Sequence, residues 1–175
     1  MAVAERDDVS VLTEGRHEGL GELRALRRAL ILQGCAQGAR RILALDPNFA
    51  DWPWSDLDVL EALAHWGRGG GRLEMLAPDY TTAARHQSRF VQWRLKWDHL
   101  LRIGSFEEGE AGAGWPTSTL VVVGGEGAGV LRVLDFEAWR ATFSRHATDR
   151  QAALEQFDAI AQRSSPSWPL STVGL

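Results

Sequence analysis

The sequence predicts an α/β domain built on a mixed, largely parallel sheet, with helices on both faces and a C-terminal β-hairpin. Short apolar runs such as RLEML alternate with longer segments of helical periodicity, which is typical of this class. The run STLVVVGGEGAGVLRVLDF places two apolar stretches around a glycine-rich turn, which predicts the hairpin. The chain has 175 residues, of which 45% are hydrophobic and 24% charged, so we expect one globular domain spanning 1–175.

Each expected element has a local reason. Strands are expected where apolar runs stand between turn residues, at 9–12, 42–45, 72–76, 99–106 and twice within 118–136. Helices are expected where apolar residues recur at helical spacing, at 22–39, 55–66, 82–98 and 149–163. Ser55 is expected to cap the second helix, with Asp58 in the capping-box position. The exposed side of the first helix is expected to carry Glu22, Arg24, Arg27 and Arg28. Residues 1–8 are expected to be a frayed end and 164–175 a tail.

Two loops that follow neighbouring parallel strands carry the best candidate binding residues. The carboxyl ends of parallel strands meet at one edge of an open sheet, which is where ligands bind. The ligand-binding residues predicted at this edge are Asp51, Trp52, Trp54, Tyr80, Arg85 and Arg89. The arginines would meet an anionic group, and the rings would stack on an apolar or aromatic part of the ligand. The competing interpretation is that the tryptophans cover the core while the loop aspartates cap turns and helices.

The segment 82–98 has the most regular pattern in the chain. At about 100° per residue, one face collects His86, Phe90, Trp93 and Trp97, and the adjoining face collects Arg85, Arg89, Gln92 and Lys96. Such paired stripes can stack a base and hold a phosphate. The favoured interpretation is an amphipathic helix that packs its aromatic residues into the core and leaves its charges in water.

Several other kinds of site have no support in the sequence. GGEGAG at 124–129 departs from the dinucleotide fingerprint, and the five histidines show no recognised ligand spacing, so neither a cofactor nor a metal is expected. A net charge of −4 does not favour nucleic acid as a partner. No apolar run is long enough for a membrane span, and Cys35 is the single cysteine, so a cytoplasmic location is expected.

The late strand STLVVVGG, the glycine turn with VLRVLDF after it, and the helix end FDAIAQRSSP from Phe157 together resemble one half of the phospholipase D superfamily fold. That family carries a His-x-Lys signature, whose histidine is the nucleophile and whose lysine holds the phosphoryl oxygens. Thr117, Ser118 and Thr119 stand in that region here, and the single lysine, Lys96, follows Arg94 rather than a histidine at the signature spacing. The resemblance therefore implies the fold without its phosphodiesterase chemistry. Because such enzymes pair two halves, it also implies a homodimer.

Three functions follow from these observations. The leading prediction is a non-catalytic, phospholipase D-like binding or interaction module, for which a phosphate-containing anion is the candidate ligand. The alternative is an enzyme in which His86 is the general base, oriented by Asp79 or Asp46, and Arg89 stabilises an anion. The third is a structural partner domain that docks through its tail at Trp168 and Leu170.

Overall fold

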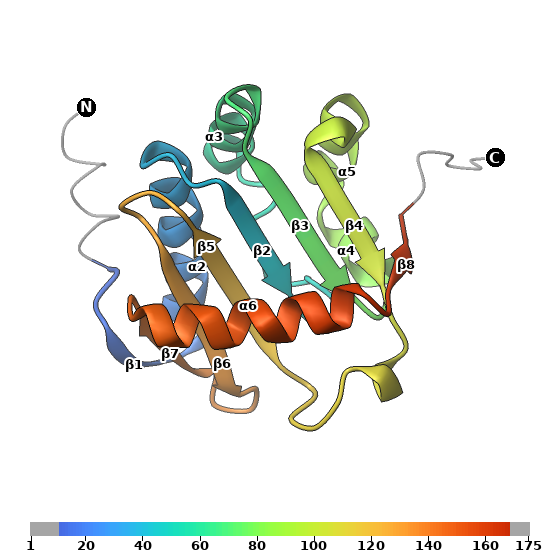
Figure 1. Cartoon of the computed structure of the whole chain (residues 1–175). Helices are drawn as coiled ribbons and strands as arrows, with labels where there is room; N and C mark the ends of the chain where they lie inside the picture. Colours follow the sequence, from blue (N-terminus) through green and yellow to red (C-terminus); the bar gives the residue numbers. More distant parts are fainter. Residues whose placement is uncertain (1–10, 169–175) are drawn as a thin grey trace.

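The computed structural model describes residues 11–168 and arranges them around one eight-stranded sheet (Figure 1). Across the sheet the strand order is β1-β7-β6-β5-β2-β3-β4-β8. The strands are β1 (Gly15–Glu18), β2 (Arg41–Leu45), β3 (Arg72–Ala77), β4 (Leu101–Ser105), β5 (Ser118–Val123), β6 (Gly129–Asp135), β7 (Arg140–Ser144) and β8 (Ser165–Pro166). The helices are α2 (Leu20–Ala36), α3 (Leu57–Arg68), α4 (Thr81–His86), α5 (Ser88–Trp97) and α6 (Ala147–Ala161), with 3₁₀ turns η1 (Asp98–Leu100) and η2 (Glu108–Glu110). No helix in the described range 11–168 combines the length and the apolar character that a membrane span requires.

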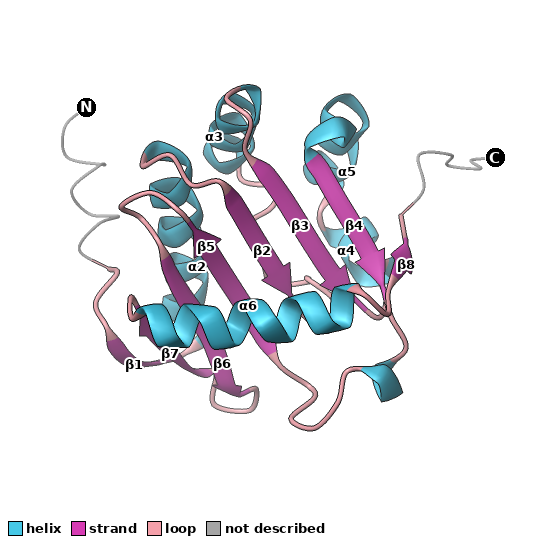
Figure 2. Ribbon diagram, in the orientation of Figure 1, coloured by secondary structure: helices cyan, strands magenta, loops and turns pink. Residues whose placement is uncertain are grey.

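Helices cover both faces of the sheet, as the sequence predicts. Figure 2 shows α6 lying across one face, while α2, α3, α4 and α5 lie on the other. Strand β2 shows why two layers form, because Ile42 and Ala44 enter the core under α2 and α3 whereas Leu43 and Leu45 enter the core under α6. A strand buried on both faces reads as a continuous apolar run, which is the pattern that predicts it.

The expectation of a largely parallel sheet is wrong. Of the seven pairings between neighbouring strands, β2–β3 and β3–β4 are parallel and the other five are antiparallel. A parallel pairing needs a crossover connection, and only the helical connections from β2 to β3 and from β3 to β4 join strands that are neighbours in the sheet. The segment from β4 to β5 holds no long helix, so β5 returns beside β2 in the opposite direction.

The C-terminal hairpin is confirmed, and a second hairpin extends it. Strands β5 and β6 pair antiparallel as far as Val122 opposite Gly129, with the glycine-rich turn between them. Strand β7, which the sequence analysis did not anticipate, then pairs with β6 and continues the sheet to β1. The strand expected at 9–12 is wrong where it can be checked, since residues 11–12 lie outside β1; residues 1–10 fall outside the described part.

The helix expected at 82–98 is broken at Gln87 into α4 and α5. The Gln87 backbone leaves helical geometry at φ −115° and ψ 51°. Its buried side-chain amide donates to the carbonyl oxygen of Trp52 at 2.7 Å and to that of Phe49 at 3.3 Å. These hydrogen bonds connect the break to the loop after β2. Because the helix is interrupted at Gln87, Arg85 and His86 on α4 do not continue the aromatic and basic faces of α5.

The start of α3 also differs from the prediction. Asp56 precedes the first turn, and the expected cap Ser55 makes no capping hydrogen bond to that turn. The Ser55 hydroxyl oxygen instead accepts a hydrogen bond from the backbone N–H of Phe90, 3.3 Å away. The polar side chain at this position therefore joins α3 to α5.

Candidate functional site

The loops after β2 and β3 meet at one edge of the sheet, as the parallel pairing requires, but their rings are buried. The exposed fractions are 4% for Trp52, 0% for Trp54 and 6% for Tyr80. The indoles of Trp52 and Trp54 stack with ring centroids 5.4 Å apart. The Tyr80 hydroxyl donates to the carbonyl oxygen of Gly104 at 2.8 Å. The three rings therefore have almost no solvent-accessible surface that a ligand could contact.

These rings belong to an aromatic cluster that holds the loops against α5 and the end of the chain. Its members are Phe49, Trp52, Trp54, Tyr80, Phe90, Trp93 and Trp168, with neighbouring ring centroids 5.1 to 6.2 Å apart. Trp168, expected in the docking tail, packs on Tyr80 at 5.2 Å and under the Arg94 guanidinium at 4.9 Å. Its proposed companion in docking, Leu170, lies outside the described residues.

The candidate carboxylates are engaged in turns and surface ion pairs. The Asp46 carboxylate accepts the backbone N–H groups of Asn48 at 3.0 Å and Phe49 at 2.7 Å. Asp51 pairs with Arg24 at 2.7 Å. Asp79 accepts the hydroxyl and the backbone N–H of Thr81, and these hydrogen bonds lower its pKa. Asp46 and Asp79 therefore have the turn-capping roles that the competing interpretation gives to loop aspartates, and Asp51 instead makes a surface ion pair.

The alternative enzyme site is not assembled in this structure. Across residues 11–168, no hydrogen bond or ion pair joins His86 to Asp79 or to Asp46. The His86 imidazole is exposed at the end of α4, whereas Asp46 is 6% exposed at the end of β2. Neither of the two proposed orienting carboxylates therefore holds this histidine in the described residues.

Arg27 is a buried cation, contrary to its expected place on the exposed side of the first helix. Its side chain is 2% exposed and lies 4.3 Å over the ring of Trp52. It donates to the Ser118 hydroxyl at 2.8 Å and lies 3.7 Å from the Asp46 carboxylate. Burial lowers its pKa to about 10, against the raising effect of Asp46, so it stays charged at neutral pH. The sequence contained a signal for this burial, because Arg27 stands four residues after Leu23 and three before Leu30 and so shares their face of the helix.

The exposed basic side chains of α3, α4 and α5 form a surface that we call the basic ridge, defined by Arg68, Arg85, Arg89 and Lys96. Residues 80–97 contain four of the nineteen basic residues of the chain and none of its twenty-three acidic ones. Fifteen basic and twenty-three acidic residues remain elsewhere, a formal net charge of −8. The segment 80–97 is therefore locally basic within an acidic chain, and three of its four basic side chains are exposed.

A ladder of rings supports the ridge along α5. Successive centroids from Phe90 through Trp93 and Trp97 to His99 lie 5.8, 6.2 and 5.9 Å apart. The Arg68 guanidinium lies 5.0 Å over the Trp97 ring, which joins the end of α3 to α5. Phe90 is buried, the two tryptophans are half-buried, and Arg89 and Lys96 are exposed beside them. The aromatic and basic stripes predicted from the sequence are therefore present within α5.

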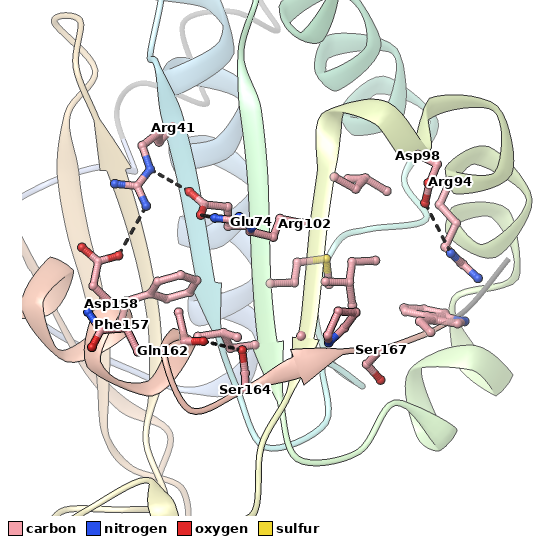
Figure 3. A pocket seen from close by; sticks show the side chains of 18 residues that line it. Arg41, Glu74, Arg94, Asp98, Arg102, Phe157, Asp158, Gln162, Ser164 and Ser167 are labelled. Atoms are coloured by element: carbon pink, nitrogen blue, oxygen red, sulfur yellow. Dashed lines mark hydrogen bonds and ion pairs between the residues drawn. The ribbon is translucent and has the colours of Figure 1, made fainter.

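A groove of about 770 Å³ lies over β2, β3 and β4 on the face of the sheet that α6 crosses, and it extends to β8 (Figure 3). At one end the Glu74 carboxylate, 5% exposed, accepts a 2.7 Å hydrogen bond from Arg41 and lies 3.8 Å from Arg102. Arg41 also lies 3.4 Å from Asp158, and the hydrogen bond to Glu74 is the main cause of its raised pKa. Two arginines face two carboxylates here, so this part of the groove carries no net charge to attract an ion. The sequence analysis missed it because its residues come from β2, β3, β4 and α6.

The fold and the ridge together define the class of this chain, an α/β domain with a mixed sheet, a buried aromatic edge and one exposed basic side. No protein-family model and no curated protein matches its sequence. Among solved structures it is similar to TrmBL2, an archaeal chromatin protein whose structure is described as showing a novel mode of DNA binding. The TM-score is 0.58 at 13% sequence identity, and the match covers 87% of this chain and 53% of TrmBL2. The chain therefore shares its fold with about half the length of that protein.

Proposed function

We propose that this chain is a non-catalytic binding module of phospholipase D-like architecture, which takes an anionic, phosphate-containing ligand on the basic ridge. The observation that carries the proposal is the separation of charge. Residues 80–97 contain three exposed basic residues, Arg85, Arg89 and Lys96, and no acidic one; the fourth basic residue there, Arg94, is buried, and the rest of the chain has a formal net charge of −8. Local rather than net charge determines where an anion is attracted, so the overall acidity of the chain does not oppose binding at this surface.

The contacts of β5 support a non-catalytic role. Thr117, Ser118 and Thr119 stand where the resemblance places the His-x-Lys pair, and all three are buried. The Ser118 hydroxyl accepts a hydrogen bond from Arg27. A hydroxyl cannot replace the imidazole nucleophile of a phosphohistidine mechanism. The family's phosphodiesterase reaction therefore has no nucleophile among these residues.

Of the ligand residues predicted from the sequence, the proposal retains Arg85 and Arg89 and adds Lys96 and Arg68. The first two are exposed on α4 and α5, whereas Trp52, Trp54 and Tyr80 are core residues. The structural neighbour TrmBL2 is described as binding DNA, and this is a reason to include DNA among the ligands tested here. A homodimer remains part of the proposal through the paired halves of the phospholipase D superfamily, and sedimentation equilibrium would measure it.

A thermal-shift panel at low salt tests the proposal with inorganic phosphate, polyphosphate, nucleotides and DNA. A ligand at one hundred times its dissociation constant adds about 2.7 kcal/mol to the folded state. For a chain of this size, that stabilisation raises Tm by roughly 5–10 °C. Arg89→Ala should reduce the rise, whereas Arg16→Ala on β1, at the far edge of the sheet, should leave it unchanged. A flat panel, or a rise that Arg89→Ala leaves as large as before, contradicts the proposal.

A further inference from the structure

We infer that the ligand of the basic ridge is double-helical nucleic acid, bound through its phosphate backbone and without base stacking. This inference rests on the proposed function and names the chemical class of its ligand. Two features of the ridge point to it: the extended arrangement of its cations, and the occupation of its aromatic faces by neighbours from the same chain.

Two of the four ridge cations follow a line along α5, and the other two lie on α4 and at the end of α3. Arg89 and Lys96 lie seven residues apart on one face of the helix, which corresponds to about 10 Å along its axis. Exposed Gln92 stands between them and can donate its side-chain amide to a phosphate oxygen. Arg85 on α4 precedes this row, and Arg68 lies at its far end over Trp97.

A row of this kind fits a polymer of phosphates better than a single phosphate group. Each strand of duplex DNA carries one charge per about 3.4 Å of helix axis, so several phosphates fall within the length of α5. A mononucleotide can reach one or two of these cations at a time. The rest of the chain is acidic and repels a polyanion, so the protein would approach a polyanion with the ridge facing it.

The ring ladder along α5 favours a duplex over a single strand as the ligand. Proteins that bind single strands stack successive bases on exposed aromatic faces. Here the Trp93 ring stacks with Phe90 and with Trp97, at 5.8 and 6.2 Å between centroids. The Trp97 ring in turn contacts His99 at 5.9 Å and the Arg68 guanidinium at 5.0 Å. These ring faces are therefore contacted by neighbours from the same chain, among them the Arg68 and Lys96 cations over Trp97, and are not free for bases to stack on.

Fluorescence anisotropy at graded salt tests the inference with the full chain. The probes are two 20-base-pair DNA duplexes of unrelated sequence, an RNA duplex of equal length and the corresponding single strands. Inorganic phosphate and polyphosphate serve as competitors. If four cations each neutralise one phosphate, the slope of log K against log salt for duplex DNA is about −3.6. Affinity then falls about 100-fold between 50 and 200 mM salt.

Two variants on the ridge test its role, and a third variant away from it is the control. Arg89→Gln and Lys96→Gln should each reduce the magnitude of the slope by about 0.9 and weaken both DNA sequences equally. Arg16→Gln, at the opposite edge of the sheet, removes the same charge from an exposed position and should leave affinity and slope unchanged. Matching thermal melts of the free proteins would show that all three variants keep the fold.

The remaining outcomes separate this inference from the proposed function. Tighter binding to single strands than to duplex, with dependence on base composition, overturns the inference in favour of base stacking. Binding of phosphate or polyphosphate that needs Arg89, without duplex binding, overturns it and leaves the proposed function in place. Duplex binding that all three variants preserve overturns both the inference and the assignment of the ridge. Binding to either the DNA or the RNA duplex, lost on the ridge alone, supports the inference and identifies the helix geometry preferred.

Discussion

Replacement of Trp54 by alanine tests the assignment of the loop tryptophans to the core. The indole is 0% exposed and packs against Phe49, Trp52 and Phe90, with ring centroids 6.2, 5.4 and 5.7 Å away. Within the described residues its Nε1 is buried without a hydrogen-bond partner, so packing rather than hydrogen bonding provides its contribution. Removing a buried aromatic side chain of this kind costs about 3–5 kcal/mol, because apolar contacts are lost and a cavity remains.

Urea unfolding followed by circular dichroism measures this cost directly, and a thermal melt gives a second readout. At 2–4 °C per kcal/mol for a domain of this size, Tm should fall by roughly 10 °C. Leu57→Ala is the control, since that side chain is 65% exposed and its removal should change the free energy of unfolding by less than about 0.5 kcal/mol. If Trp54→Ala were as mild as Leu57→Ala, the indole would not be a core residue. Trp52 and Trp54 would then be accessible enough to contact a ligand, as the sequence analysis predicted.

Two further predictions concern the interior of the domain. Gly67→Ala should destabilise the protein by about 1–3 kcal/mol, because a Cβ there would lie 2.2 Å from the side chain of Leu100. Gly21 lies in a helix with no atom within 4 Å of an added Cβ, so Gly21→Ala should instead stabilise the protein by about 0.5–1 kcal/mol. Urea unfolding measures the change in the free energy of unfolding for both variants. Equal changes would refute the packing of α3 on η1. Burial raises the pKa of the Cys35 thiol to about 12, so its thiolate is scarce at pH 8, and a thiol reagent should react far faster in urea than in the native state. Equally fast labelling in both states would show that the thiol is accessible.

Much of the frame could be predicted from local pattern. Strands β2 and β3 and the hairpin of β5 and β6 are apolar runs between turn residues, and apolar runs report burial whatever lies opposite them. Their parallel pairing then brings the loops after β2 and β3 to one edge, as expected. The stripes of α5 were also visible, because helical spacing places side chains on faces without reference to the rest of the fold.

The remainder depends on partners that are distant in sequence. The break at Gln87 is tied to carbonyl oxygens 35 and 38 positions away, and Arg27 is buried beside a hydroxyl 91 positions away. Local propensity cannot show such partners. The strand β7 was missed although its two buried residues, Ala141 and Phe143, alternate with polar ones, which is a local pattern that predicts a half-buried strand.

Composition and periodicity are properties of the chain alone, and they were enough to predict the α/β class, the main buried strands and the positive charge of residues 80–97. The antiparallel pairing of five of the seven strand neighbours, the core position of the loop tryptophans, and the burial of Arg94 while Arg85, Arg89 and Lys96 stay exposed all depend on the tertiary structure. Whether a ring packs or recognises a ligand depends on what covers it. For Trp52 and Trp54 the cover comes from Arg27 on α2 and Phe90 on α5, which folding alone brings to that edge of the sheet.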